Sequence, residues 1–183
     1  MSVLTAQPPE GRFILHRFNG DEVYRLKSAV MYAYKTPTRP GFFARALSAV
    51  MCACKINSGV VTLWFEAIAD PENAQRCEDS GRSPEAHIGI NLPSLNANEM
   101  VGREFDIPGA KTEDEDASMS RLYYYEHEVL NDNRITIVSR SGNRFWLRWT
   151  GITQDVCFYD GSKPPTRVEI EGEFLFKDID EWI

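Results

Sequence analysis

Residues 121–150 read RLYYYEHEVLNDNRITIVSRSGNRFWLRWT, and this stretch predicts the fold. Apolar and polar residues alternate along three of its segments, as they do in strands that bury one face. Between the segments, 131–133 and 141–143 have the composition of three-residue hairpin loops. The stretch therefore predicts antiparallel strands joined by tight turns, and the strands are 121–130, 134–140 and 144–150.

Three-residue loops fix which residues lie opposite each other in this predicted ribbon. Counting outward from the loops puts Ile137 opposite Leu147 and His127, and it puts Ile135 opposite Trp149 and Val129. These residues share the side that we expect to face the core with Tyr125, Ser139 and Phe145. The outward side is expected to carry Tyr124, Glu126, Glu128, Arg134, Thr136, Val138, Arg140, Arg144, Trp146 and Arg148.

The same alternation recurs on both sides of the ribbon. Further strands are expected at 12–18, 22–35, 48–56, 60–69, 87–92, 100–107, 152–159 and 167–177. Gly172 interrupts the apolar row of the last of these strands, which predicts a β-bulge there. Two polar segments, 70–84 and 108–120, are expected to form mobile loops.

The strand pattern predicts one domain, 1–183, that is all-β. We expect about nine to ten strands, mostly linked by hairpins, with little helix. No repeated strand–helix–strand pattern argues for a parallel sheet. The expected architecture is therefore an antiparallel β-sandwich or a closed β-barrel.

An eight-residue pattern occurs twice in the first third of the chain. Residues 28–35 read SAVMYAYK and residues 48–55 read SAVMCACK, so six of eight positions are identical. Strand alternation would give both copies the same row of Ala, Met, Ala and Lys on one face. The turn-forming residues 57–59 follow the second copy, so 48–56 and 60–69 are expected to form a hairpin.

The chain is acidic, with 27 acidic and 20 basic residues and a formal net charge of −7. This balance argues against a nucleic-acid partner, whose phosphates would be repelled, and it favours basic partners. No apolar stretch is long enough for a membrane-spanning helix, so no membrane partner is expected. The first residues lack the features of a signal peptide, which predicts a cytoplasmic protein, with secretion after signal removal left open.

The strongest candidate binding feature is a tryptophan flanked by two arginines on the predicted outward face. Tryptophan and arginine are enriched among the residues that dominate protein interfaces. Two local alternatives stand beside this interpretation: the arginines cover the indole and pair with Glu126 or Glu169, or another layer covers the face. The candidate binding residues are Arg144, Trp146, Arg148, Tyr124 and Arg140.

Cysteine and histidine supply only weak candidates for a metal site, namely Cys52, Cys54, His87 and His127. One residue separates Cys52 from Cys54, which is closer than the usual zinc-binding pair, so reduced thiols are the favoured interpretation. His127 is expected to be buried and hydrogen-bonded. The chain contains no phosphate-loop, nucleophile-elbow or calcium-loop motif, so no cofactor and no catalytic residue is predicted.

These observations favour a non-enzymatic binding protein whose partner is another protein or a second copy of itself. A small-ligand carrier is one alternative, because a barrel of this size can hold a ligand. An uncharacterised enzyme is the other. The binding protein predicts an outward-facing Trp146 and a core without a sizeable cavity. The carrier predicts an enclosed apolar pocket, and the enzyme predicts titratable groups that converge in a cleft.

Overall fold

The computed structural model describes residues 11–36, 60–72, 74–75, 82–108 and 120–178. These residues form ten strands in a single sheet and one short 3₁₀ helix, η1 (Ala97–Glu99). The prediction of an all-β chain with little helix is therefore confirmed. In chain order the strands are β1 (Arg12–Arg17), β2 (Gly20–Thr36), β3 (Val60–Ala69), β4 (Glu85–Leu92), β5 (Glu104–Ile107), β6 (Ser120–Tyr123), β7 (His127–Val129), β8 (Asn131–Ser141), β9 (Arg144–Thr153) and β10 (Thr166–Asp178).

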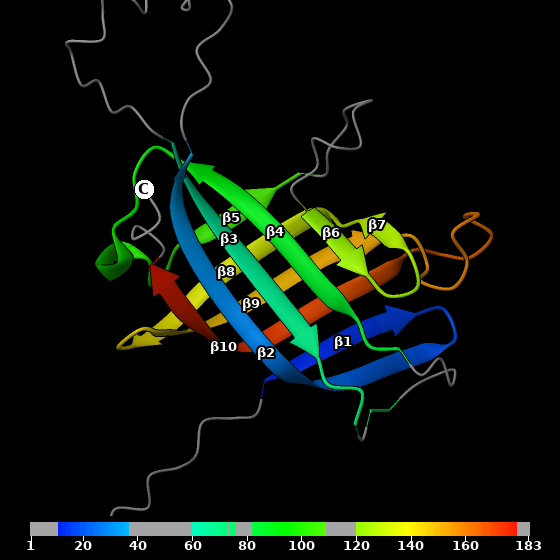
Figure 1. Ribbon diagram of the computed structural model, residues 1–183. Helices are drawn as coiled ribbons and strands as arrows, with labels where there is room; N and C mark the ends of the chain where they lie inside the picture. The colour runs from blue at the N-terminus through cyan, green and yellow to red at the C-terminus, as the bar shows by residue number, and fades with distance from the viewer. Residues whose placement is uncertain (1–10, 37–59, 73, 76–81, 109–119, 179–183) are drawn as a thin grey trace, which may run out of the picture.

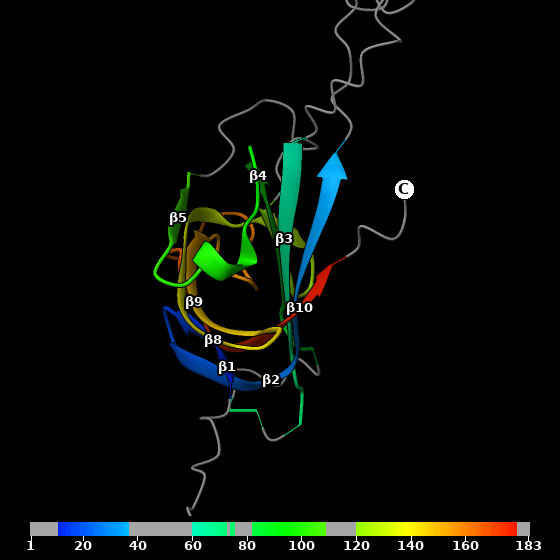
Figure 2. The same ribbon diagram turned by 90° about the vertical axis from the view of Figure 1, so that its left-hand side faces the viewer.

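The sheet curls over so that its strands lie in two layers (Figures 1 and 2). Its order is β5-β8-β9-β10-β1-β2-β3-β4-β6-β7, and neighbours in this order are antiparallel. The layer of β2, β3 and β4 lies in front of β8, β9 and β10 in Figure 1. Among the described residues the end strands β5 and β7 do not pair with each other, so the sheet is not closed into a barrel.

β2 joins the two layers because its two halves have different partners. Its first half pairs with β1. Its second half pairs with β3, and it also runs parallel to the end of β10, where Val30 lies opposite Leu175. The register shifts between Leu26 and Ser28. Such a bulge bends a strand and increases its twist, which lets one sheet form both layers.

Gly172 marks a close approach between strands rather than the predicted β-bulge. The register of β9 and β10 is continuous through Gly172. A Cβ atom at this position would lie 2.6 Å from Leu26 Cδ1 and 2.9 Å from Gly11 Cα. Any side chain here would therefore collide with β2 and with the start of β1.

Apolar side chains fill the interior between the layers. The Ala-Met-Ala row of the first octapeptide faces this interior, where Met31 is fully buried and Ala33 is buried. Phe65 of β3 meets Phe174 of β10 edge to face, with ring centroids 6.4 Å apart. Burying one large apolar side chain contributes on the order of 1.5–3 kcal/mol. The largest of the fully buried side chains are Trp149, Tyr24, Phe13, Phe65, Phe145 and Phe174.

The hairpin predicted from 134–140 and 144–150 is confirmed. Ile137 lies opposite Leu147, and Ile135 lies opposite Trp149, as counting from the turn predicted. All four side chains are fully buried, with 0% of their surface exposed. The alternation of apolar and polar residues therefore identified the core face correctly as far as Ile137, whereas Ser139, which was expected on the core side, is exposed.

The turn of this hairpin differs from the prediction. Ser141 pairs with Arg144, so two residues form the turn instead of three. Val138 is skipped in the pairing with β9, and this bulge cancels the one-residue offset. On the turn side of the bulge, Arg140 lies opposite Phe145 instead of Arg144. The two arginines, which a three-residue loop at 141–143 would place opposite each other, are therefore not a cross-strand pair.

The prediction of one continuous strand over 121–130 is wrong. The chain turns at residues 124–126, and β6 pairs with β7 so that Tyr123 lies opposite His127. The neighbours of β8 are β5 and β9. None of the predicted pairs between 121–130 and β8 therefore forms, and the predicted loop at 131–133 is the start of β8.

Other predicted segments are partly right. Segment 60–69 matches β3, whereas 100–107 contains only the short strand β5, because the chain turns at Gly102 with a φ of 84°. Segment 152–159 is strand only as far as Thr153, where β9 ends.

Of the hairpin expected between 48–56 and 60–69, only the second strand lies within the described residues, as β3. Residues 61–68 have β2 on one side and β4 on the other, so both edges of β3 are occupied. Segments 48–56, 57–59 and 109–119 lie outside the described residues, as do positions 73 and 76–81 of the loop expected at 70–84.

Candidate functional site

The outer face of β9 carries Arg144, Trp146 and Arg148, because the residues that alternate with them are buried. Each arginine has a carboxylate partner on β10. Arg144 Nη1 lies 2.6 Å from Glu173 Oε1, and Arg148 Nε lies 2.9 Å from Glu171 Oε1. Trp146 is half-buried between these pairs. The candidate face is therefore a network of ion pairs around the indole of Trp146.

Glu171 is the centre of this network. Its Oε2 also accepts from Arg12 Nη2 at 3.1 Å, and its Oε1 accepts from Trp146 Nε1 at 3.4 Å. Burial alone would raise the pKa of Glu171, but hydrogen bonds from Arg148, Arg12 and Trp146 outweigh it and lower the pKa. Carboxylates of β10 thus neutralise the arginines, as one local alternative expected. The partners are Glu171 and Glu173 instead of Glu126 or Glu169.

Tyr124 and Arg140 lie away from this face. Tyr124 is only 6% exposed, and its hydroxyl donates to Glu22 Oε2 at 2.9 Å. The guanidinium of Arg140 stands over the Phe145 ring, 4.9 Å from its centroid, and donates to Asn98 Oδ1 at 2.8 Å. The five candidate residues therefore do not form one surface, and the outward position predicted for Tyr124 is wrong.

Arg17, Glu22 and Asp155 form a buried charge cluster. Arg17 Nη1 donates to Glu22 Oε1 at 2.8 Å. Arg17 Nε and Nη2 donate to the two oxygens of Asp155 at 3.1 and 2.9 Å, which gives a two-pronged contact. All three side chains are 0% exposed. The cluster ties the end of β1 and the start of β2 to the segment that follows β9.

Two tyrosines complete the buried charge cluster. Tyr24 and Tyr124 donate their hydroxyl protons to Glu22 Oε2 at 2.6 and 2.9 Å. Burial, followed by the hydrogen bond to Glu22, raises the pKa of Tyr24 far above its usual value. Burial alone would raise the pKa of Asp155, but hydrogen bonds, led by that from Arg17, outweigh it and lower the pKa. These groups bond to one another, so the cluster holds chain segments together.

The sequence held one signal for this cluster. Arg17 continues the apolar parity of Phe13 and Leu15, and Glu22 shares its parity with Tyr24. Opposite charges in the apolar rows of two hairpin-linked strands indicate a buried ion pair. Asp155 follows the end of β9 and has no periodic signal of its own.

An aromatic row crosses the outer face of β2, β3, β4, β6 and β7, one ring from each strand. Successive ring centroids lie 6.1 Å apart from β3 to β4, 5.0 Å from β4 to β6 and 4.4 Å from β6 to β7. The β2 ring lies directly opposite the β3 ring in the strand register. The row consists of Tyr32, Trp64, His87, Tyr123 and His127.

The side chains of the aromatic row are partly accessible. His127 is exposed, which makes the prediction of a buried histidine wrong, and the other four are half-buried. Tyr32 donates its hydroxyl proton to Glu66 Oε2 at 3.0 Å, and burial together with this bond raises the pKa of Tyr32 to about 12. His87 Nε2 contacts Glu85 Oε1. No sequence signal groups these rings, because only the strand order brings them together.

The two histidines among the weak metal candidates do not meet. His87 and His127 belong to the aromatic row, where the ring of Tyr123 lies between them. Cys52 and Cys54 lie outside the described residues. Within the described part of the chain, no three His, Cys, Asp or Glu side chains are grouped to hold a metal ion.

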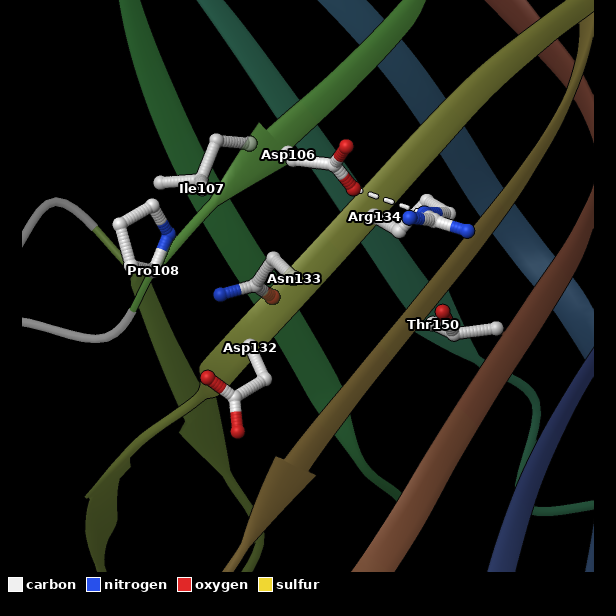
Figure 3. A pocket seen from close by; sticks show the side chains of 7 residues that line it. All are labelled: Asp106, Ile107, Pro108, Asp132, Asn133, Arg134 and Thr150. Carbon is white, nitrogen blue, oxygen red and sulfur yellow. Dashed lines mark hydrogen bonds and ion pairs between the residues drawn. The ribbon is translucent and has the colours of Figure 1, made fainter.

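A surface pocket of about 430 Å³ lies beside β5, β8 and β9 (Figure 3). Arg134 Nε pairs with Asp106 Oδ1 at 2.7 Å at its rim, and Asn133 Oδ1 accepts from buried Trp149 Nε1 at 2.9 Å. Arg134, Asp106 and Asn133 thus already bond to other groups of the protein. The pocket is lined by Asp106, Ile107, Pro108, Asp132, Asn133, Arg134 and Thr150.

Comparisons with protein-family models, with curated proteins and with solved structures gave no match. Among the described residues there is no helix with the length and apolar character needed to cross a bilayer.

Proposed function

We propose that this protein is a non-enzymatic binding protein that engages a protein partner through the aromatic row. The observation that carries the proposal is five neighbouring rings on the outer face of five strands, four half-buried and one exposed. Single exposed apolar residues are ordinary, whereas a continuous set is typical of interaction sites. Aromatic rings also give a large contact area and are enriched at the centres of interfaces.

Two features support surface binding over the alternatives. The aromatic side chains that fill the interior, such as Phe65 and Trp149, argue against a carrier with an enclosed cavity. The buried charge cluster directs its donors and acceptors at one another, which argues against its use as a reactive site.

The face around Trp146 is the weaker candidate surface. Its arginines already pair with Glu171 and Glu173, so a partner would have to compete with those contacts. Ion pairs of this exposed type are easily rearranged and contribute about 0–1 kcal/mol. The aromatic row carries more ring surface and fewer internal ion pairs, so it is the preferred site.

The proposal can be tested with a Tyr123→Ser/His127→Ser variant of the full chain. Val138→Ser is the matched control, because Val138 is an exposed apolar residue on β8 in the other layer. Wild type and both variants are immobilised and exposed to proteins from the source cell, and each retained protein is then purified and titrated directly. We expect a partner that binds wild type and the control equally and the double variant at least tenfold more weakly.

Light scattering over a wide concentration range supplies the second readout. Self-association that is lost in the double variant would identify the partner as a second copy of the chain. The proposal fails if no retained protein and no self-association depends on the aromatic row. It also fails if every partner binds the double variant as tightly as the control.

A further inference from the structure

We infer that the partner presents a basic segment whose arginine or lysine side chains stack on the aromatic row. This inference rests on the proposed function, and the expected occupant of the aromatic row is a cationic protein segment. Three features of the described residues carry it: a cation already seated on the row, carboxylates beside the rings, and the acidic balance of the chain.

The first feature is Lys177 at one end of the row. Its Nζ stands 5.9 Å from the centroid of the Tyr32 ring, within the range of a cation–π contact. Lys177 is exposed and belongs to β10, which runs parallel to β2 at this point. The row therefore begins with a ring that receives an ammonium group of the protein itself. An incoming cation would find the same chemistry on the rings farther along the row.

The second feature is the carboxylates beside the rings. Glu66 shares the outer face of β3 with Trp64 and lies opposite His87, and Glu85 lies opposite Tyr123. Both carboxylates are half-buried, so they are screened less than fully exposed charges. A guanidinium on the Trp64 ring would have a carboxylate at its edge, a combination that fits arginine better than an uncharged side chain.

The third feature is the charge of the whole chain. Arg121 is the basic residue of β6 on this face, opposite His87, so the local surface is not uniformly acidic. The formal net charge of −7 nevertheless attracts a basic partner over longer distances. Long-range attraction raises the encounter rate, and the rings with their carboxylates then provide the specific contact.

The test uses the full-length, ¹⁵N-labelled protein and synthetic peptides of equal length. Hexa-arginine and hexalysine are the probes, and hexaglutamate and hexaserine are the controls. The indole N–H signal of Trp64 is followed in NMR titrations, with the signal of Trp146 as a reference on the other layer. We expect saturable shifts of the Trp64 signal with hexa-arginine, weaker shifts with hexalysine, and none with either control.

Variants separate the rings from the carboxylates. Tyr123→Ser/His127→Ser should weaken hexa-arginine binding by about tenfold, because two ring contacts are lost. Glu66→Gln/Glu85→Gln keeps the shape and one acceptor oxygen on each side chain, and it should weaken binding by about two- to fivefold at low salt. Val138→Ser should bind as wild type does. The serine substitutions on β6 and β7 and the glutamine substitutions all change side chains on the outer face. They leave the core side chains unchanged, so each variant is expected to fold.

Several outcomes would overturn the inference. It fails if hexa-arginine does not shift the Trp64 signal, if hexaserine shifts it equally, or if only the Trp146 signal responds. Self-association that depends on the row, without any response to hexa-arginine, would overturn the basic partner and leave the proposed function standing. The absence of both a peptide response and a row-dependent partner would overturn the two together.

Discussion

Two glutamates, one with a fully buried side chain and one with a side chain that is 14% exposed, each accept hydrogen bonds from arginine and from aromatic side chains. Glu22 accepts hydrogen bonds from Arg17 and from the hydroxyls of Tyr24 and Tyr124, and its side chain is 0% exposed. Glu171 accepts bonds from two arginines and from the Trp146 indole at the surface, and its arginine partners are more than half exposed, at 53% and 65%. In both sites a carboxylate is held by arginine and by aromatic hydrogen-bond donors, but the two sites differ in their access to water.

The exposure of the two sites determines how much their ion pairs contribute to the stability of the fold. An exposed ion pair is solvated in both the folded and unfolded states, so its net contribution is about 0–1 kcal/mol. In the buried charge cluster, removal of one partner leaves an uncompensated charge without water, at a cost of about 3–5 kcal/mol. The bonds to Glu22 are 2.6–2.9 Å long and those to Glu171 are 2.9–3.4 Å long, so the buried site combines shorter bonds with lower exposure.

Matched substitutions on β1 give the largest expected contrast. Arg17→Met should lower the free energy of unfolding by about 3–5 kcal/mol, because Glu22 and Asp155 both lose their cation. Arg12→Met removes a cation from Glu171 by the same chemical change, and it should cost no more than about 1 kcal/mol. Urea unfolding followed by tryptophan fluorescence measures both. Equal losses in the two variants would show that burial of the cluster has no energetic consequence.

The pH dependence of stability separates the two sites further. The pKa of Asp155 is lowered in the folded protein, so its contribution is complete above its ordinary pKa of 3.8 and is lost as the pH falls below that value. The pKa of Tyr24 is raised, so the unfolded chain ionises first above its ordinary value of 10.0, and stability falls there as well. The unfolding free energy should therefore decline at both extremes.

Salt distinguishes the buried contribution from the surface one. The pKa of Glu171 is also lowered, and its share of the acid-side loss begins below its ordinary value of 4.5. Molar salt screens exposed charges within about 3 Å, whereas buried pairs are screened much less. Urea titrations at pH 5, 4 and 3 with and without salt should show an acid-side loss that persists in salt. A loss that salt abolishes would assign it to surface carboxylates instead.

The two sites also differ in how well the sequence predicts them. The face around Trp146 follows from alternation along one strand, because Arg144 and Arg148 share its parity, and their outward position is confirmed. Its partners on β10 require the strand order, which alternation does not contain. The buried charge cluster depends on contacts between residues more than 130 positions apart, such as Arg17 and Asp155 with a separation of 138, so local patterns identify only its β1–β2 half.

The main error in the predicted fold is the single strand over 121–130, and a long-range contact of Tyr124 accounts for it. Residues 121–130 alternate well enough to read as one strand, and Tyr123, Tyr124 and Tyr125 contain none of the usual turn-forming residues. The chain nevertheless turns at 124–126, and this turn lets the hydroxyl of Tyr124 reach Glu22 in the buried charge cluster. A long-range polar contact thus accompanies a local break that β propensity opposes. The aromatic row was missed because Trp64, His87 and Tyr123 come from three separate segments.

The smallest expected effect comes from a matched pair of glutamine substitutions. Glu171→Gln keeps the side-chain shape, removes the charge and replaces one acceptor oxygen by an NH2 group, and it should cost about 0.5–1 kcal/mol because water and the remaining polar groups solvate its arginines. Glu22→Gln makes the same change where water has no access, and it should cost several times more. Urea unfolding of both variants, each at low and high salt, measures the ratio. Because both glutamates accept from arginine and from an aromatic O–H or N–H group, a ratio near one would mean that exposure does not control their energetics.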